Sequence, residues 1–303
     1  MTRGFLVRGT VSVIAAAMVS STAVRLAAQG PPPPPKAAPP PGWIDPRNPP
    51  KEDPNWQPPR TADGQPNIEG QWGQASDIIT YSIEDPEAER AGHTAISGQR
   101  PMVGRPIIDP IDGKIPYQPW AAAKAKDIYD HHMDPKPYQL DPQARCWLQG
   151  VPRGTLQSES HVVQTPGQIV ILHDYSHSYR VIPLDNRPKL PEHMKLFMGE
   201  SRGRWEGNTL VIDTTNLNDI PWFDIVGSFH SDAIRVAERI TRIDDETLEY
   251  LATVEDTKMY TRPWTMRFTM KRNTEPGYEQ WEHACYEGER SLHRLLARPD
   301  SGR

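Results

Sequence analysis

The chain has 303 residues, of which 36% are apolar, so it is long enough to bury a real core in one large or two small domains. Its formal net charge is −5, with 39 acidic residues against 34 basic ones. This balance disfavours binding to nucleic acid, because the phosphate backbone selects positively charged surfaces.

The first 28 residues have the pattern of a secretory signal peptide. Arg3 and Arg8 precede an apolar run, and small residues follow as far as Ala28. The apolar run is shorter than the roughly 20 residues that a bilayer span needs, so a retained anchor is the weaker interpretation. We expect an exported protein, periplasmic or secreted, with no membrane anchor once the signal is removed.

Residues 29–59 are predicted to form a disordered, proline-rich arm. Of the chain's 33 prolines, a large share lies here, including an unbroken run at residues 31–35. Proline lacks the amide donor, and the arm has few apolar side chains, so it cannot build a core. We expect a polyproline-type tether, with the folded part starting near Arg60.

Residues 60–159 show no sustained hydrophobic period, and we expect an irregular, partly helical covering segment of the same domain. A short apolar piece ends in Gly70-Gln71-Trp72. The best helix candidate is 120–130, which is rich in strong helix formers, follows Pro119 and ends before Pro135.

Residues 160–303 are predicted to be mainly β, because short β-branched and apolar runs alternate there with turn residues. Without helices between them, these runs should be antiparallel neighbours. About eight strands in such a meander close into a barrel, which removes exposed edges and can hold one small ligand. A short C-terminal helix at 289–298 is expected outside the barrel. The predicted strands cover residues 160–165, 168–175, 178–184, 199–206, 208–215, 233–242, 246–254, 263–271 and 278–286.

The clearest β-hairpin spans residues 199–214. Gly207-Asn208 tolerates the positive φ of a two-residue turn, and a β-branched run follows it. The same segment contains Gly199-x-Ser201-x-Gly203, the pattern of a serine-hydrolase nucleophile elbow. That elbow requires a helix directly after the serine, whereas a strand is predicted here, so we expect Ser201 to be an ordinary strand residue.

Alternation along the strands assigns aromatic and methionine side chains to the barrel interior. These are Tyr250, Trp264, Met266, Phe268 and Met270. They would suit a flat or irregular apolar ligand. The alternative is that they simply fill the core, because an eight-stranded barrel is small enough for side chains to occupy it.

Glu238 falls on the same interior face, among branched aliphatic residues. A buried carboxylate there needs a cation, a donor network or water. One interpretation is a structural salt bridge. The other is an enzyme, a hydrolase, lyase or isomerase without organic cofactor, in which Glu238 and the rim residue His230 act as acid and base. Arg239 or Tyr260 would then stabilise developing charge.

Cys146 and Cys285 are the only cysteines in the chain. In an oxidising compartment we expect them to form a disulfide; the alternative is two separate buried thiols. His173 and His177 flank Asp174 at a predicted hairpin tip, and this set could hold a metal. No recognised zinc, calcium or phosphate-binding motif supports such a site, so we expect neither metal nor cofactor.

Several segments together resemble an uncharacterised family of exported bacterial proteins. They are residues 63–72, 146–153, 199–214, 230–239, 255–264 and 281–287, so the likeness spans nearly the whole chain after residue 60. It implies export but no activity. Gly70-Gln71-Trp72 and the meander also give a looser likeness to lipocalin-type (calycin) barrels, which implies binding of a small ligand. The long segment 73–159 departs from the compact lipocalin pattern.

The leading hypothesis is therefore an exported β-barrel that binds a small apolar or aromatic molecule in its interior. The enzyme of the same shape is the second hypothesis. A third is an interaction or structural protein that acts through its proline-rich arm, residues 29–59.

Overall fold

The computed structural model describes residues 53, 55–74, 81–84, 106–132, 134–281, 283 and 285. The predicted signal peptide, most of the proline-rich arm and the predicted helix 289–298 lie outside these residues. None of the helices in the described part has the length and hydropathy of a membrane span.

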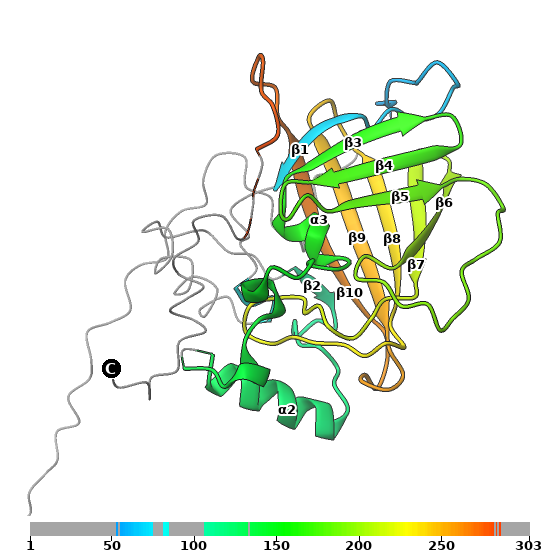
Figure 1. Ribbon diagram of the computed structural model, residues 1–303. Helices are drawn as coiled ribbons and strands as arrows, with labels where there is room; N and C mark the ends of the chain where they lie inside the picture. The colour runs from blue at the N-terminus through cyan, green and yellow to red at the C-terminus, as the bar shows by residue number, and fades with distance from the viewer. Residues whose placement is uncertain are drawn as a thin grey trace, which may run out of the picture. The chain divides into compact units, whose positions relative to one another are not determined.

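Ten strands form one antiparallel sheet that curls into a nearly closed barrel (Figure 1). Nine of them follow the order β5-β4-β3-β1-β10-β9-β8-β7-β6, and short β2 pairs with β10 beside this path. In Figure 1, β3, β4 and β5 cross in front of β8, β9 and β10. The strands are β1 (Gly70–Gln74), β2 (Ile107–Asp109), β3 (Ser160–Thr165), β4 (Gln168–His173), β5 (Tyr179–Pro183), β6 (Glu200–Glu206), β7 (Thr209–Thr215), β8 (Arg235–Arg242), β9 (Thr247–Glu255) and β10 (Trp264–Arg272).

The predicted antiparallel meander is confirmed as two runs of consecutive strands, β3 to β5 and β6 to β10, and the two-residue turn at Gly207-Asn208 joins β6 to β7. The predicted strand at 278–286 is wrong: residues 278–281 lie in no strand, and His283 forms only an isolated bridge with Tyr175. The ninth strand of the barrel is instead β1, which lies between β3 and β10. Its short length and its two glycines hid the alternation that would have predicted it.

In the described residues two α-helices accompany the barrel, α2 (Pro119–Asp130) and α3 (Arg153–Gln157). Helix α2 is the predicted one, with proline in its first turn. The sequence did not predict α3, which lies against the barrel in Figure 1 and buries four of its five residues. Short 3-10 turns, η1 (Pro137–Gln139) and η2 (Pro142–Arg145), connect the two helices.

Strands β5 and β6 stand at the two ends of the strand order, and no backbone ladder joins them. We call this line the seam. Side chains close it: Gly203 of β6 lies so close to Ile182 and Leu184 that an added Cβ would meet their methyl carbons at 2.8 and 2.7 Å. The barrel wall is therefore held by packing along this one line and by hydrogen-bonded ladders between the other strands of the path.

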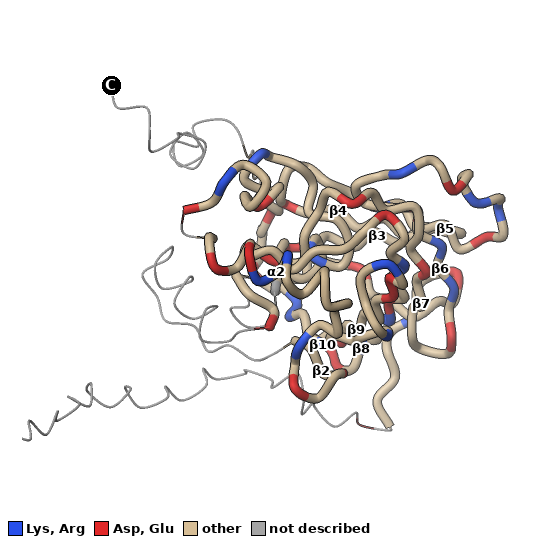
Figure 2. The backbone as a smooth tube through the Cα atoms, turned by 90° about the horizontal axis from the view of Figure 1, so that it is seen from below, with Lys and Arg blue, Asp and Glu red and all other residues tan. Residues whose placement is uncertain are grey.

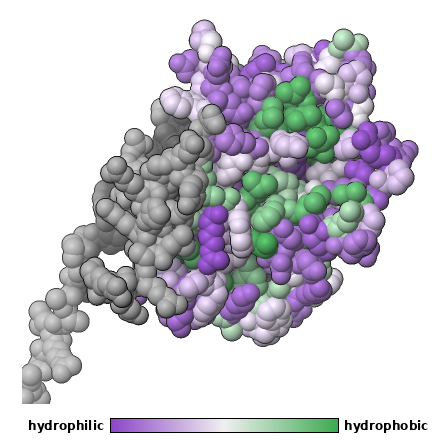
Figure 3. Space-filling view, viewed as in Figure 1, coloured by the Kyte–Doolittle hydropathy of each residue, from purple (hydrophilic) through white to green (hydrophobic). Residues whose placement is uncertain are grey.

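The outer surface carries mixed charge and some apolar side chains. Basic and acidic residues are interspersed along the described chain (Figure 2), so neither sign defines a face. Hydrophobic side chains appear on the face shown in Figure 3. Leu172, Tyr179 and Val181 of β4 and β5 are among the exposed ones, and Tyr179 is 62% exposed.

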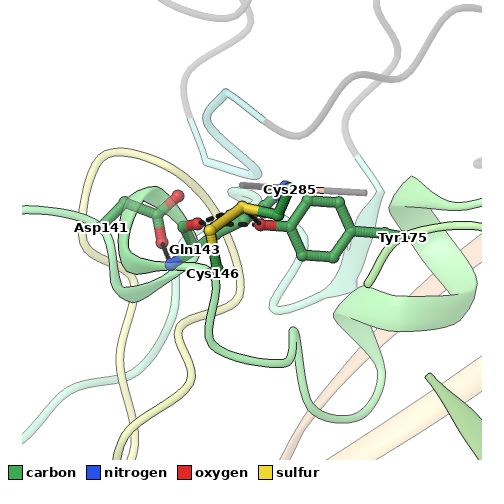
Figure 4. The surroundings of a disulfide bond; sticks show 5 residues. All are labelled: Asp141, Gln143, Cys146, Tyr175 and Cys285. Carbon is green, nitrogen blue, oxygen red and sulfur yellow. Dashed lines mark hydrogen bonds between the residues drawn. A yellow bond between two sulfur atoms is a disulfide. The ribbon is translucent and has the colours of Figure 1, made fainter. Parts of the chain in front are cut away.

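Cys146 and Cys285 form the predicted disulfide, which Figure 4 draws with its surroundings. Their Cα atoms are 5.5 Å apart. Cys146 follows η2 in a left-handed conformation, and the Tyr175 hydroxyl lies 2.8 Å from the Gln143 carbonyl oxygen and 3.2 Å from the Cys285 Sγ. The bond thus fixes the segment after the last strand to the η2 turn.

Candidate functional site

Glu238 lies in the barrel interior and is fully buried, on the face that alternation along β8 predicts. Arg180 of β5 binds it with both guanidinium ends, Nη1 to Oε1 at 2.8 Å and Nη2 to Oε2 at 2.5 Å. The Tyr250 hydroxyl donates to Oε1 at 2.6 Å, and the Thr214 hydroxyl donates to Oε2 at 3.1 Å. Both carboxylate oxygens are therefore engaged by the barrel's own side chains, as in the salt-bridge interpretation.

The pair joins opposite sides of the seam. Arg180 also donates from Nη2 to the Ser201 hydroxyl of β6 at 2.9 Å. Burial disfavours the charged guanidinium, but the charge of Glu238 outweighs this, and the pKa of Arg180 lies above its ordinary value. Burial, together with the Glu238 charge, raises the pKa of Tyr250 well above its ordinary value. Ser201 is thus a strand residue that supports the ion pair.

His230 and Tyr260 belong to a different cluster, in the loops next to the strand ends. Both are buried. The Nδ1 of His230 lies 2.9 Å from the carbonyl oxygen of Ser231, and its ring packs on Phe223 with 5.1 Å between centroids. Burial lowers the pKa of His230. The Tyr260 hydroxyl donates to the backbone carbonyl of Phe229 at 2.9 Å.

Arg239 points away from both clusters. Neighbouring residues of a strand face opposite sides of the sheet, so Arg239 lies outside the barrel when Glu238 lies inside. It pairs with Glu206 at 2.9 Å, with the two side chains 48% and 42% exposed. The structure therefore does not bring the predicted catalytic residues together, since they divide between the interior, the loop cluster and the outer surface.

The five predicted ligand-binding residues form a packed aromatic core. Tyr250, Trp264, Met266, Phe268 and Met270 are each at most 3% exposed. Tyr250 stacks on Phe268 with 4.4 Å between ring centroids, and Trp264 meets Phe223 edge-on at 5.3 Å. None of them lines the two cavities described below, and their role in ligand binding stays a prediction.

A cavity of about 390 Å³ lies between α2 and the loops that face it; we call it the α2 cleft. Small side chains of the helix leave this space, because Ala122 and Ala125 stand where larger residues would fill it. The rings of Tyr117 and Tyr129 line the cleft. The complete lining is Ser82, Glu84, Lys114, Ile115, Tyr117, Ala122, Ala125, Lys126, Tyr129, Asp130, Val226, Gly227 and Ser228.

Glu84 places a partly buried carboxyl group in the wall of the cleft. Its Oε1 accepts a hydrogen bond from the backbone N–H of Ile115 at 2.5 Å. Burial raises the pKa of Glu84, although this hydrogen bond and Lys114 act in the opposite direction. The cleft thus combines aromatic and aliphatic surface with one carboxyl group of altered acidity, a combination typical of small-molecule sites.

Asp224 holds the back of the cleft in place. This residue is fully buried and accepts hydrogen bonds from the backbone N–H of Ile83 at 3.1 Å and from the Ser228 hydroxyl at 2.7 Å. Burial raises its pKa despite these donors. Asp224 therefore ties residues 81–84 to the loop 224–228, two segments that line the cleft.

Tyr117 connects the cleft to the predicted residue Tyr260. The Tyr117 ring packs 5.4 Å from the Tyr260 ring and 5.6 Å from the Phe229 ring, between centroids. Its hydroxyl accepts the backbone N–H of Phe229 at 2.9 Å. Tyr260 thus lies one layer behind the wall of the cleft and supports it.

A second, larger cavity of about 780 Å³ lies beside β8 and the loop after β9. Its wall carries both signs of charge and a few aliphatic side chains, with no aromatic residue. Several of these groups satisfy one another, as when Lys258 pairs with Asp232 at 2.7 Å. It lacks the aromatic rings that the α2 cleft presents to an apolar ligand.

In the part of the chain that the structure describes, no group of three or more His, Cys, Asp or Glu residues could hold a metal ion. His173, considered above as a ligand, is buried in the barrel, where its Nδ1 lies 3.2 Å from the Ser160 hydroxyl.

Sequence reasoning missed the α2 cleft because its wall comes from segments far apart in the chain, with Glu84 between β1 and β2 and Ser228 between β7 and β8. The alanine-rich face of the predicted helix was the one available signal. Comparison with models of protein families, with curated proteins and with solved structures finds no match to this chain.

Proposed function

We propose that this protein is an exported binding protein for a small, partly apolar molecule, which it takes up in the α2 cleft. The observation that carries the proposal is the composition of that cavity of about 390 Å³, where two tyrosine rings and aliphatic side chains lie beside two carboxylate residues and two lysines. Ligand sites for small molecules typically occupy about 300 to 1,000 Å³ and pair apolar walls with a few polar groups. The disulfide supports a place in an oxidising compartment.

The cleft, rather than the barrel interior, is the better site for such a ligand. The interior aromatic residues already contact one another, as Tyr250 and Phe268 do. In the cleft, the Tyr117 and Tyr129 rings would contact the apolar body of the ligand. Glu84 would hydrogen-bond its polar group. Lys114 and Lys126 balance the charge of Glu84 and Asp130, so the site favours a ligand of low net charge.

The test uses the neutral, apolar fluorescent probe N-phenyl-1-naphthylamine. It is excited at a wavelength longer than those that tryptophan absorbs, so that the introduced tryptophans do not contribute to the signal. Ala125→Trp should fill the cleft, because Ala125 lines it. Ala123→Trp is the matched control on the same helix, since Ala123 is exposed and is not part of the lining.

We expect saturable binding to the unmodified protein and to Ala123→Trp, and an affinity at least about tenfold weaker in Ala125→Trp, the loss expected when the apolar contacts of one ring are excluded. Equal binding to all three proteins, with all three folded by circular dichroism, would place the probe elsewhere and overturn the proposal.

A further inference from the structure

The barrel interior contains buried nitrogen atoms without a hydrogen-bond partner among the described residues. They include the Nε of Arg180 and the Nε2 of His173, which lie on neighbouring strands. Both residues are only 3% exposed. Buried polar atoms in native proteins are nearly always paired, and an unpaired one costs about 1–3 kcal/mol. Two such atoms in one interior therefore indicate a partner that the chain itself does not supply.

The two atoms belong to neighbouring strands and to the same face. Arg180 of β5 stands opposite Ile171 of β4, and His173 follows two residues after Ile171. Residues two apart in a strand share a face, so Arg180 and His173 are diagonal neighbours on the interior side. Burial and the nearby positive charge of Arg180 lower the pKa of His173 to about 3, so the imidazole is neutral at ordinary pH.

The Ser160 hydroxyl determines which imidazole nitrogen carries the proton. Its hydrogen-bond partner in the described part of the chain is the Nδ1 of His173. A buried hydroxyl hydrogen needs an acceptor, so Ser160 donates to Nδ1. In a neutral imidazole the proton then lies on Nε2. Both unpaired atoms, Arg180 Nε and His173 Nε2, are therefore N–H donors.

The charge of the surroundings limits the partner to a neutral group. Glu238 already balances the charge of Arg180 through two hydrogen bonds. An anion added beside this pair would leave a net buried negative charge, which is strongly unfavourable. Helix α3 lies against the imidazole, since a Cβ added to Gly154 would lie 3.5 Å from His173 Nε2.

We propose that the barrel interior holds a neutral oxygen acceptor that receives hydrogen bonds from Arg180 Nε and His173 Nε2. The oxygen belongs either to a buried water molecule or to the carbonyl group of a small bound molecule, and both present the same chemistry. This site is separate from the α2 cleft and does not depend on the proposed function.

A high-resolution crystal structure of the full mature chain is the first test. We expect an electron-density peak about 3 Å from both nitrogens. Native mass spectrometry of Ala125→Trp, whose α2 cleft is filled, distinguishes the two sources, because a carbonyl ligand in the barrel leaves an added mass on this variant and a lone water does not. An interior without density between the two nitrogens would overturn the proposal.

Two further measurements test the same inference, one in solution and one in crystals of two variants. Long-range ¹H–¹⁵N NMR of the imidazole should show the Nε2–H tautomer of His173, and the Nδ1–H tautomer would contradict the inference. In crystals, His173→Gln retains an N–H donor and should keep the peak, whereas His173→Leu should lose it. A peak that persists unchanged in His173→Leu would show that the oxygen does not depend on this residue.

Discussion

At the scale of single residues, the Arg180–Glu238 pair explains how a barrel of this size accommodates charge in its interior. A buried carboxylate is unfavourable unless it meets a cation and further donors. Here Arg180, Tyr250 and Thr214 supply them. The alternation of β8 predicted the interior position of Glu238, but the partner could not be predicted, because Arg180 lies 58 residues earlier in the chain.

Breaking this pair should destabilise the protein strongly. Glu238→Gln and Arg180→Met each leave the other partner without its counter-charge, and each should lower the free energy of unfolding by about 3–5 kcal/mol. The double variant removes both charges and should lose less than the sum of the two single losses. Urea unfolding of the four proteins measures this.

Strictly additive losses in that cycle would mean that the two side chains do not stabilise each other. Arg239→Met provides the control on the same strand, because its exposed pair with Glu206 should contribute almost nothing measurable.

The buried imidazole of His173 makes stability depend on pH. Its pKa is about 3 in the folded protein, and an unfolded histidine has a pKa of about 6.5. Between these values the unfolded state binds more protons, so this residue's contribution to stability is complete above about pH 6.5 and falls as the pH decreases. Glu84 and Asp224 have raised pKa values and act in the opposite sense, so a variant must isolate the effect.

The comparison is His173→Gln against the unmodified protein. The stability difference between them should shift by up to about 1.4 kcal/mol per pH unit as the pH falls from 6 to 4, to the disadvantage of the unmodified protein. Chemical unfolding at several pH values checks this, and a difference that stays constant with pH would be inconsistent with a buried, neutral His173.

At the scale of elements, the seam between β5 and β6 shows where side-chain packing replaces a hydrogen-bonded ladder. Gly203 leaves the space that Ile182 and Leu184 occupy. The hairpin of β6 and β7 was predictable, because its turn and its β-branched run are local signals. The closure of the barrel and the place of β1 depend on contacts between distant segments, so no local pattern indicates them. The same reason hid α3.

A methyl group at the seam should separate the two strands slightly. Gly203→Ala would meet both neighbouring side chains below 3.0 Å and should cost about 1–2 kcal/mol of unfolding free energy. Gly73→Ala in β1 is the matched control, because its Cβ would find only ordinary contacts at 3.7 Å and beyond. Thermal unfolding compares the two, and equal effects would show that the seam is not tightly packed.

At the scale of the whole molecule, the disulfide links the segment after the barrel to the turn before α3. It closes a loop of 139 residues, which in the chain-entropy model stabilises by about 4–5 kcal/mol. Its pairing followed from the two cysteines and the predicted export.

Removing the bond should lower stability throughout the barrel. We compare the oxidised protein with the double variant Cys146→Ser/Cys285→Ser and with the unmodified protein kept in a reductant. Both should unfold at a lower guanidinium midpoint, and both should lose about 4–5 kcal/mol of unfolding free energy, the figure given above. A midpoint equal to that of the oxidised protein would mean that the bond adds no net stability.

The proposed binding function rests on the α2 cleft. Because the ligand is unidentified, the most direct measurement is native mass spectrometry of the protein purified from its own host, alongside Ala125→Trp and Ala123→Trp expressed there. We predict an added mass on the unmodified protein and on Ala123→Trp that is absent from Ala125→Trp. The same added mass on all three proteins, or none on any of them, would contradict ligand binding in the α2 cleft.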